Sequence, residues 1–188
     1  FIDFIISTGA NLYHDMHFAL NYPLHKGTWQ IDDRTLWDEK IVRIYDIFLT
    51  TDTLLQTDKY SQKIILDKKT PQGVVSSAEW HHYFGRCLLR DAPNPRISIL
   101  AQAARFNVPV YTSSPGDSTM GMDLTAYSYL FHDGGVDIHI NPNLDVAETT
   151  ALVFGAKENG AILVGGGSPK NFYMQTQPML WECLGVEK

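Results

Sequence analysis

Three short segments of small and polar residues have the composition from which a ligand site is most readily built. They are Ser7-Thr8-Gly9-Ala10-Asn11, Ser113-Ser114-Pro115-Gly116-Asp117-Ser118 and Gly165-Gly166-Gly167-Ser168, and each leads from an apolar run into a helical pattern. Small residues let the backbone approach a ligand closely, and free N–H groups at a helix N-terminus attract an anion such as a pyrophosphate. Each segment alone is equally typical of a helix start. None matches G-x-G-x-x-G or G-x-x-x-x-G-K-[ST], so a dinucleotide would be held in a nonstandard way.

Other residues offer weaker indications of chemistry. His14 and His17 share a helix face, but no H-E-x-x-H motif or Cys/His cluster supports a metal site, so we expect none. Asp117 lies in a turn, where its carboxylate can accept ribose hydroxyls or hold a cationic amine, or simply begin a helix. Lys170 falls in the first turn of a helix, where a cation is unfavourable. The serines lack the G-x-S-x-G motif of a hydrolase.

The elements that must position these residues alternate between apolar runs and helical patterns. We expect strands at 1–6, 41–48, 108–112, 136–140 and 161–164. We expect helices at 11–20, 50–66, 76–92, 97–106, 120–130, 146–157 and 168–182, and a loop at 21–38. This order predicts an α/β fold with a mostly parallel sheet and helices on both faces. The three segments then share the carboxyl edge of the sheet, where such folds bind ligands.

Local capping signals support several of these helices. Ser76 and Glu79 have the spacing of a capping box. Ser168 is expected to be an N-cap, with Pro169 as the first helical residue. Pro178 is expected to kink or break the last helix.

Composition excludes several classes of protein. The chain has 188 residues, is 44% hydrophobic and 19% charged, and has a net charge of −6. That composition supports one folded domain. We expect no nucleic-acid binding, because the basic residues form no stripe. We expect no membrane span, because no apolar run approaches about 20 residues. Two cysteines without a CxxC motif indicate a reducing, cytoplasmic setting. The chain starts inside an apolar run and stops after a helical pattern, so we expect a piece of a longer protein.

Read together, the three segments resemble deoxyhypusine synthase, and more narrowly its bacterial deoxyhypusine synthase-like branch. The similar residues run over nearly the whole chain and occur in the family's order. The resemblance implies a Rossmann-like NAD-binding fold, and homotetramers with active sites between paired subunits. It also implies a reaction in which NAD takes a hydride from spermidine and 1,3-diaminopropane leaves. The 4-aminobutyl group then passes to an acceptor amine through an imine on a lysine.

The resemblance also assigns residues to the cofactor site. Thr8, Gly9 and Ala10 match the backbone cradle for NAD. Asp117 matches an aspartate that contacts NAD, and Gly166 matches a glycine packed against the cofactor.

At the substrate positions the side chains differ from those of the eukaryotic enzyme. Tyr13-His14 replaces two adjacent glutamates, and Asn171 replaces a histidine beside the reacting amine. Met122 replaces an aspartate that binds the polyamine, with Asp123 next to it. A site with fewer carboxylates binds a polycation less tightly, so a shorter or differently charged amine stays an alternative to spermidine.

The family's catalytic lysine lies in a Ser-Trp-Gly-Lys motif that this chain lacks, and Lys170 is not its equivalent. We therefore expect residues 1–188 to be a single NAD-binding domain from the middle of a longer chain. Two functions stay open. One is a deoxyhypusine synthase-like, NAD-dependent aminobutyl transferase acting on spermidine or a related polyamine. The other is a catalytically inactive NAD- or polyamine-binding subunit with a regulatory or scaffolding role.

Overall fold

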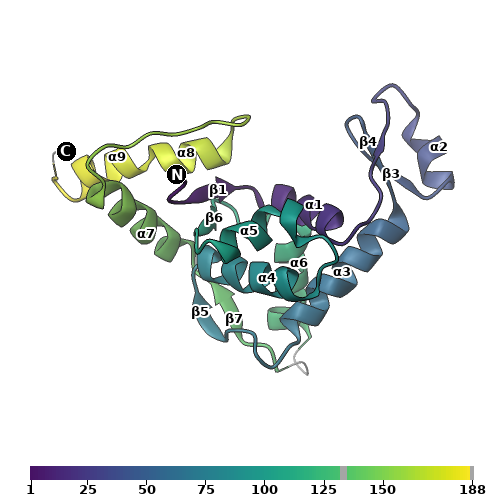
Figure 1. Cartoon of the computed structure of the whole chain (residues 1–188), viewed down its shortest axis with the longest axis horizontal. Coiled ribbons are helices and arrows are strands. Elements are labelled where there is room, and N and C mark those ends of the chain that lie inside the picture. Colours follow the sequence, from purple (N-terminus) through teal and green to yellow (C-terminus); the bar gives the residue numbers. More distant parts are fainter. Residues whose placement is uncertain (132–134, 187–188) are drawn as a thin grey trace.

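Helices and short strands alternate along the computed structural model, which describes residues 1–131 and 135–186 (Figure 1). The strands are β1 (Ile5–Ser7), β2 (His25–Lys26), β3 (Ile41–Ile44), β4 (Ile47–Thr50), β5 (Gly73–Val75), β6 (Val110–Thr112) and β7 (Ile138–Ile140). The α-helices are α1 (Gly9–Ala19), α2 (Asp33–Asp38), α3 (Thr51–Ile65), α4 (Ser77–Asp91), α5 (Ile99–Arg105), α6 (Thr119–Thr125), α7 (Pro142–Gly155), α8 (Ser168–Met174) and α9 (Thr176–Pro178). A 3-10 turn at Pro95–Ile97 precedes α5, and π-helical turns follow α6 and α9 at Ala126–Leu130 and Met179–Cys183.

The strands form parallel pairs, as the strand–helix alternation predicts. β1 pairs with β6, with Ile5 opposite Val110, and β5 pairs with β7, with Gly73 opposite Ile138. The α/β fold is therefore confirmed. The described strands form three small sheets, and the third is an antiparallel ribbon in the order β2-β4-β3.

Helices cover both faces of the β1–β6 pair. Successive strand residues point to opposite faces, so neighbouring residues of one strand pack against different helices. Val110 belongs to the main core, together with Ile5, against side chains of α1, α4, α5 and α6. Tyr111 points the other way and packs with Phe172 of α8 and with Ile6. The predicted two-sided covering of the strands is thus confirmed at this pair.

Side-chain caps explain where most helices begin. The Glu79 N–H donates to Ser76 Oγ at 3.1 Å, which confirms the expected cap of α4. The expectation for Ser168 is wrong, because Ser168 is the first residue of α8 and Gly167 precedes it with φ at 85° and no side-chain cap. A backbone turn that only glycine adopts readily therefore replaces the hydroxyl cap.

Three other expectations differ from the structure. The run 41–48 is a hairpin, β3 and β4, turned by Tyr45 in the left-handed region with φ at 52°. The expected loop 21–38 contains β2 and α2. Residues 161–164 form no strand, and Ile162 and Val164 are 90% and 95% exposed. Their apolar composition predicted a strand, but no neighbouring strand among the described residues pairs with them.

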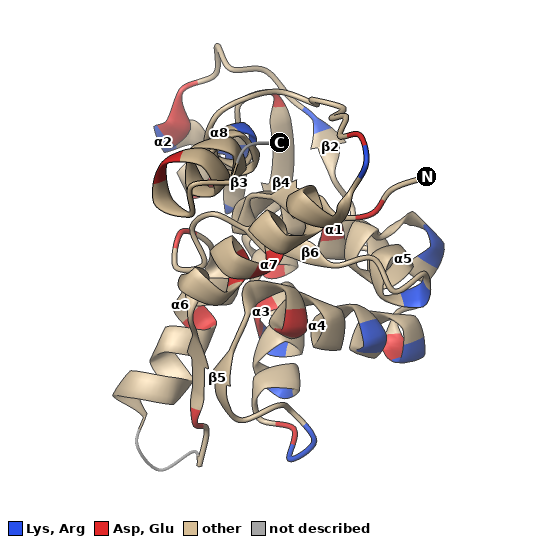
Figure 2. Ribbon diagram, turned by 90° about the vertical axis from the view of Figure 1, so that its left-hand side faces the viewer, with Lys and Arg blue, Asp and Glu red and all other residues tan. Residues whose placement is uncertain are grey.

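Figure 1 shows the hairpin β3–β4 with α2 at one end of the molecule and α7 to α9 at the other. The run of small helices at the chain's C-terminal end changes geometry at Pro178, the residue expected to kink or break it. Among the described residues, no helix combines the length and the apolar character needed to cross a membrane. Figure 2 shows the positions of Lys and Arg and those of Asp and Glu interspersed along the ribbon in this view.

Candidate functional site

Two of the three predicted ligand segments meet at one edge of the β1–β6 pair. Because the strands are parallel, the turn at 7–11 and the turn at 113–118 both follow the carboxyl ends of their strands. A Cβ added at Gly9 would lie 2.5 Å from Ser118 Oγ, which is too close for any real side chain. Gly9 is therefore required for the two turns to touch.

This edge offers groups that suit an anionic cofactor. Thr8 Oγ1 accepts the Asn11 N–H at 3.2 Å, while the Gly9 and Ala10 N–H groups have no acceptor in the part of the chain that the structure describes. Ser113 Oγ is buried there without a hydrogen-bond partner. Asp117 lies exposed in the neighbouring turn. Backbone donors at the start of an 11-residue helix fit a pyrophosphate, and an orphaned hydroxyl fits a further polar contact.

The third segment lies apart from these two turns. Gly165 and Gly167 have φ at 89° and 85°, and nothing lies within 4 Å of a Cβ built at Gly166. The segment belongs to an exposed arch between α7 and α8, visible at the top of Figure 1. Asn171 is exposed on α8, which contacts β1 through its apolar side. Gly166 and Asn171 make no hydrogen bond to either turn among the described residues.

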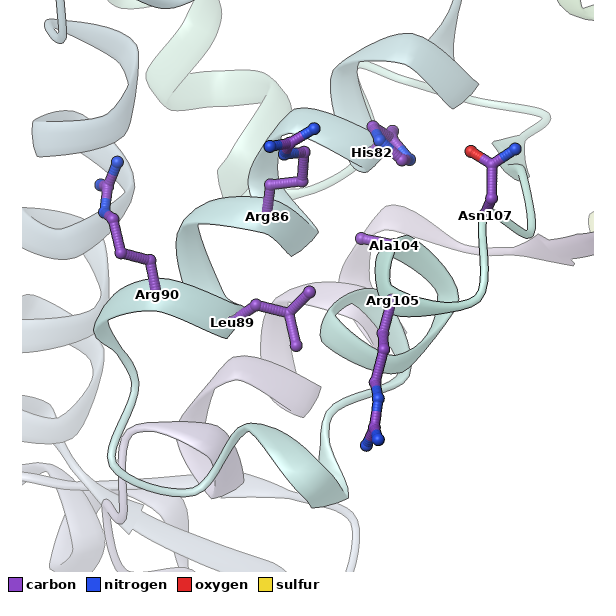
Figure 3. Close-up of a pocket in the computed structure, with 7 residues that line it drawn as sticks. All are labelled: His82, Arg86, Leu89, Arg90, Ala104, Arg105 and Asn107. Carbon is purple, nitrogen blue, oxygen red and sulfur yellow. The ribbon is translucent and has the colours of Figure 1, made fainter.

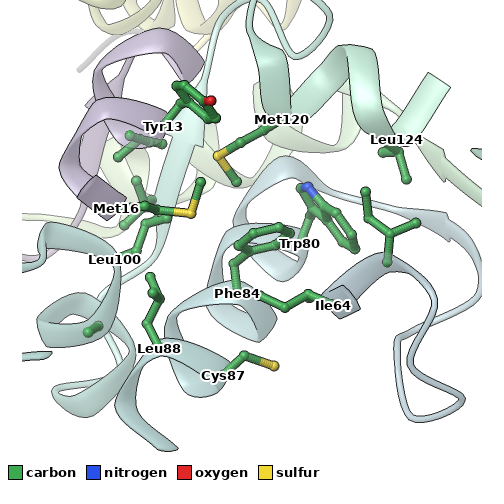
Figure 4. Close-up of a cluster of buried hydrophobic side chains, with 14 of the residues drawn as sticks. Tyr13, Met16, Ile64, Trp80, Phe84, Cys87, Leu88, Leu100, Met120 and Leu124 are labelled. Carbon is green, nitrogen blue, oxygen red and sulfur yellow. The ribbon is translucent and has the colours of Figure 1, made fainter. Parts of the chain in front are cut away.

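A second group of polar residues lies between α1, α3 and α6. The Tyr13 hydroxyl donates to Asp58 Oδ1 at 2.5 Å, and Gln62 Nε2 donates to Asp123 Oδ1 at 3.2 Å. Asp123 is 9% exposed, and its Oδ2 is buried without a hydrogen-bond partner. Tyr13 lies beside Met120 at the edge of the apolar core (Figure 4). We call Tyr13, Asp58 and Asp123 the carboxylate cluster.

The charge states in the carboxylate cluster follow from burial. Burial raises the pKa of the Tyr13 phenol, and Asp58 and then Asp123 raise it further, so Tyr13 stays protonated and donates. Burial also raises the pKa of Asp123, although the hydrogen bond from Gln62 and the nearby Ser61 hydroxyl lower it in part. A buried carboxylate with a free oxygen is stabilised by a cation that donates hydrogen bonds, such as an ammonium group.

Two histidines extend this cluster along α1. His14 Nδ1 lies 3.1 Å from His17 Nε2, and His17 Nδ1 lies 2.7 Å from Thr57 Oγ1 of α3. The Tyr13 ring meets both imidazoles edge-on, with centroids 5.2 Å and 5.0 Å apart. No cluster of three metal-ligating side chains occurs within residues 1–131 and 135–186.

Asp15, between the two histidines in sequence, has a different role. It accepts hydrogen bonds at 2.8 Å from both Ser98 Oγ and the Ile99 N–H, at the start of α5. Asp15 therefore caps α5 and faces away from the histidines.

Asp58 and Thr57 are the residues that sequence reasoning missed. Asp58 and Thr57 occur in a polar stretch whose only visible pattern was helical spacing. Their partners lie 45 and 40 positions away in the chain. No local signal identifies such contacts.

A separate groove of about 540 Å³ runs between α4 and α5. Figure 3 shows His82 and Arg86 of α4 on one side of it, and Arg105 and Asn107 on the other. The Arg90 and Arg105 side chains point away from each other, and Arg90 is paired with Asp91. None of the predicted site residues lines this groove.

The comparison with known families decides which family this arrangement belongs to. A family model described as deoxyhypusine synthase matches residues 1–187. The chain belongs to the deoxyhypusine synthase family. The resemblance seen in the three motifs is thereby confirmed.

Relatives within the deoxyhypusine synthase family share the whole of this chain. The chain is 43% identical over 195 residues to the "Deoxyhypusine synthase-like protein" of Nostoc punctiforme, covering 100% of this chain and 49% of that protein. It is 42% identical over 198 residues to the protein of the same name from Thermosynechococcus vestitus, covering 100% and 48%. It is 34% identical over 188 residues to the "Probable deoxyhypusine synthase 2" of Methanosarcina mazei, covering 99% and 52%. The chain thus spans about half the length of the curated relatives it matches.

Proposed function

We propose that this chain is the NAD-binding part of a deoxyhypusine synthase-like aminobutyl transferase that acts on spermidine or a related polyamine. The observation that carries the proposal is the carboxylate cluster, in which Asp123 Oδ2 is buried without a partner. Such an oxygen fits an ammonium donor. Residues 1–188 then form a single domain within a longer protein.

NAD, when bound, supplies the acceptor for a hydride from the amine-bearing carbon. The Gly9 and Ala10 N–H groups would bind its pyrophosphate at the start of α1, next to Thr8. Asp117 would accept a ribose hydroxyl from the opposite turn. Gly166 is proposed as a further cofactor contact, by family resemblance.

The substrate amine would lie against Asp58 and Asp123. A cationic amine favours the ionised form of Asp123, so its binding would lower the pKa that burial has raised. Tyr13 holds Asp58 in place through its hydroxyl. His14 and Asn171 are proposed as further substrate contacts.

We propose a homotetramer in the cytoplasm with active sites between subunits, supported by family membership. Both cysteines are free, with Cys87 buried and Cys183 exposed, which fits a reducing compartment. In such an assembly the exposed Gly166 and Asn171 would meet residues from outside this chain.

The direct test incubates the full-length protein with NAD and spermidine, with and without putrescine. Release of 1,3-diaminopropane together with a new polyamine supports the transferase. NAD binding without release of 1,3-diaminopropane contradicts it and supports the second candidate, a binding subunit without turnover. That candidate is favoured by Met122 and Asn171, which replace the family's aspartate and histidine.

The Asp123→Asn variant tests the amine site separately. Loss of a charge-assisted hydrogen bond weakens binding by about 1.5–3 kcal/mol, so we expect spermidine affinity to fall about 10- to 100-fold. Titration calorimetry measures the affinity, with NAD affinity as the internal reference. Asp38→Asn removes the same charge from an exposed position on α2 and is expected to leave both affinities unchanged. Equal losses in the two variants would show that net charge, and not the cluster, binds the amine.

A further inference from the structure

A continuous line of hydrogen bonds connects the backbone of α3 to the imidazole of His14. Thr57 Oγ1 donates to the Thr53 carbonyl at 2.9 Å. His17 Nδ1 lies 2.7 Å from the same hydroxyl oxygen, and His17 Nε2 lies 3.1 Å from His14 Nδ1. Thr57 and His17 are both fully buried, so water cannot substitute for a missing partner.

The carbonyl at one end sets the direction of every hydrogen bond in this line. A carbonyl oxygen only accepts, so the single Thr57 hydroxyl proton points to Thr53. The Thr57 oxygen must then accept from His17, which places the proton of His17 on Nδ1. Burial lowers the pKa of His17 to about 4, so its other nitrogen, Nε2, carries no proton at neutral pH.

The same reasoning then fixes His14. Because His17 Nε2 only accepts, the proton between the two rings belongs to His14 Nδ1. Burial lowers the pKa of His14 as well, so the ring is neutral and its Nε2 carries a lone pair. No hydrogen bond to His14 Nε2 forms within the described part of the chain, and the side chain is partly exposed.

We propose that Thr57 and His17 are positioning residues that hold His14 in the Nδ1–H tautomer, so that its Nε2 accepts a hydrogen bond from the ammonium group of the substrate. This inference rests on the proposed function. The opposite tautomer would present an N–H to an ammonium that also only donates, and the two would repel. A buried threonine of α3, which does not itself touch the amine, thus decides whether His14 attracts or repels it.

The neighbouring charged groups agree with this role. Tyr13 lies against His14 on α1, Asp58 faces Tyr13 from α3, and Asp123 faces them from α6. A neutral acceptor beside two carboxylates binds an ammonium without adding a third negative charge. His14 therefore orients the ammonium group through a hydrogen bond, while the carboxylates attract it through their charge.

The tautomer can be measured without turnover. We would label the histidines of the full-length protein with ¹⁵N and record two-bond ¹H–¹⁵N spectra at neutral pH, assigning His14 by its loss in His14→Gln. The expected result is a protonated Nδ1 and an unprotonated Nε2 on His14. A proton on Nε2 of His14 in the wild-type protein would overturn the proposal, and the variant is needed only to assign the signal.

Thr57→Val and Thr57→Ser form the matched pair of variants. Valine keeps the shape of the side chain and removes the hydroxyl. His17 then loses the hydrogen bond that favours one of its two tautomers. We expect mixed tautomers on His14 and spermidine affinity lowered about tenfold, with NAD affinity unchanged. Serine restores the hydroxyl, and we expect it to restore both the tautomer and the affinity. A purely structural role for Thr57 predicts a lower melting temperature in Thr57→Val without a change of tautomer, and that result would also overturn the proposal.

These outcomes separate the two proposals. If spermidine does not bind at all, the proposed function fails while the tautomer of His14 is still determined. If spermidine binds but Thr57→Val changes neither tautomer nor affinity, the positioning role fails alone.

Discussion

His81 and His17 are buried histidines whose rings are held by hydrogen bonds that suit the neutral form. His81 Nδ1 donates to the Val110 carbonyl at 2.7 Å and so joins α4 to β6. Burial lowers the pKa of His81 to about 4, and the hydrogen bond raises it only in part. His82, the next residue, lines the groove beside α5 instead. Adjacent residues of one type therefore have different roles, which the sequence pair does not distinguish.

The lowered pKa of His81 makes stability depend on pH. The unfolded chain binds this proton below about pH 6.5 and the folded chain only below about pH 4, so the contribution to stability is lost as pH falls through that window. His81→Asn removes this dependence. We expect the variant to be less stable than wild type at pH 7, and the difference to shrink by up to about 3 kcal/mol toward pH 4.

Melting temperatures of the full-length protein between pH 4 and pH 8 measure this effect. His82→Asn is the control and is expected to follow the wild-type curve. A difference between His81→Asn and wild type that stays constant over this range would contradict the prediction.

Among the elements, α4 and α5 pack against each other with a close backbone approach at Gly85. A Cβ at Gly85 would lie 2.2 Å from the Leu100 carbonyl oxygen and 2.7 Å from Ala104 Cβ. The helices therefore approach so closely that only a hydrogen atom fits at position 85. Leu100 and Leu88 fill the core beside this contact.

Gly85→Ala is expected to destabilise the protein by about 1–3 kcal/mol or more, because the backbone of α5 must move away from α4. Thermal unfolding of the full-length protein measures it. Gly155→Ala, at the exposed end of α7 with nothing within 4 Å, is the matched control and should be neutral or slightly stabilising. Equal melting temperatures for the two variants would mean that α5 tolerates the displacement.

Most helix starts could be predicted because their caps are local, as with Ser76 and Glu79 three residues apart. The cap of α5 could not, because half of it is Asp15, 83 residues from Ser98. The carboxylate cluster likewise combines residues that could be predicted from the sequence with one that could not. Asp123 and Tyr13 were found through family resemblance, while Asp58 depends on a contact between helices that no sequence spacing reveals.

At the scale of the whole molecule, α7 and α8 are joined to the remainder by a small interface. Phe172 packs against Tyr111 and Ala78, and Asp145 of α7 accepts the Ser77 N–H at 2.8 Å at the start of α4. Burial raises the pKa of Asp145 to about 6, although hydrogen bonds from Ser77 lower it in part. One oxygen of this carboxylate, Oδ2, has no partner among the described residues.

Asp145 is expected to make this interface weaker as pH rises. Its folded pKa lies above the ordinary value of 3.8, so its contribution to stability is present below pH 3.8 and lost as pH rises through about 6. Asp145→Asn keeps the acceptor oxygen for Ser77 without the charge. We expect it to gain up to about 3 kcal/mol relative to wild type between pH 4 and pH 8.

Melting curves of the full-length protein at both pH values test this, with the exposed Glu158→Gln as the control. A gain of the same size in Glu158→Gln would attribute the effect to net charge.

The α/β class could be predicted from alternation alone, and the arrangement of the strands only in part. Residues 161–164 are apolar enough for a strand, but a strand needs a neighbour, and composition does not say whether one is available. Tyr45 turns the β3–β4 hairpin in a conformation usual for glycine or asparagine. Because a tyrosine is not a typical turn residue, the sequence gives no signal for this turn.

The parallel pairing of β1 with β6 has a consequence for synthesis of the protein. Ile5 finds its partner Val110 only after about a hundred further residues have been made. At about 5–20 residues per second, β1 leaves the ribosome roughly 5–20 seconds before β6. During that time an apolar strand has no native edge to join. Translation speed in this interval is therefore expected to affect how much of the newly made chain folds correctly.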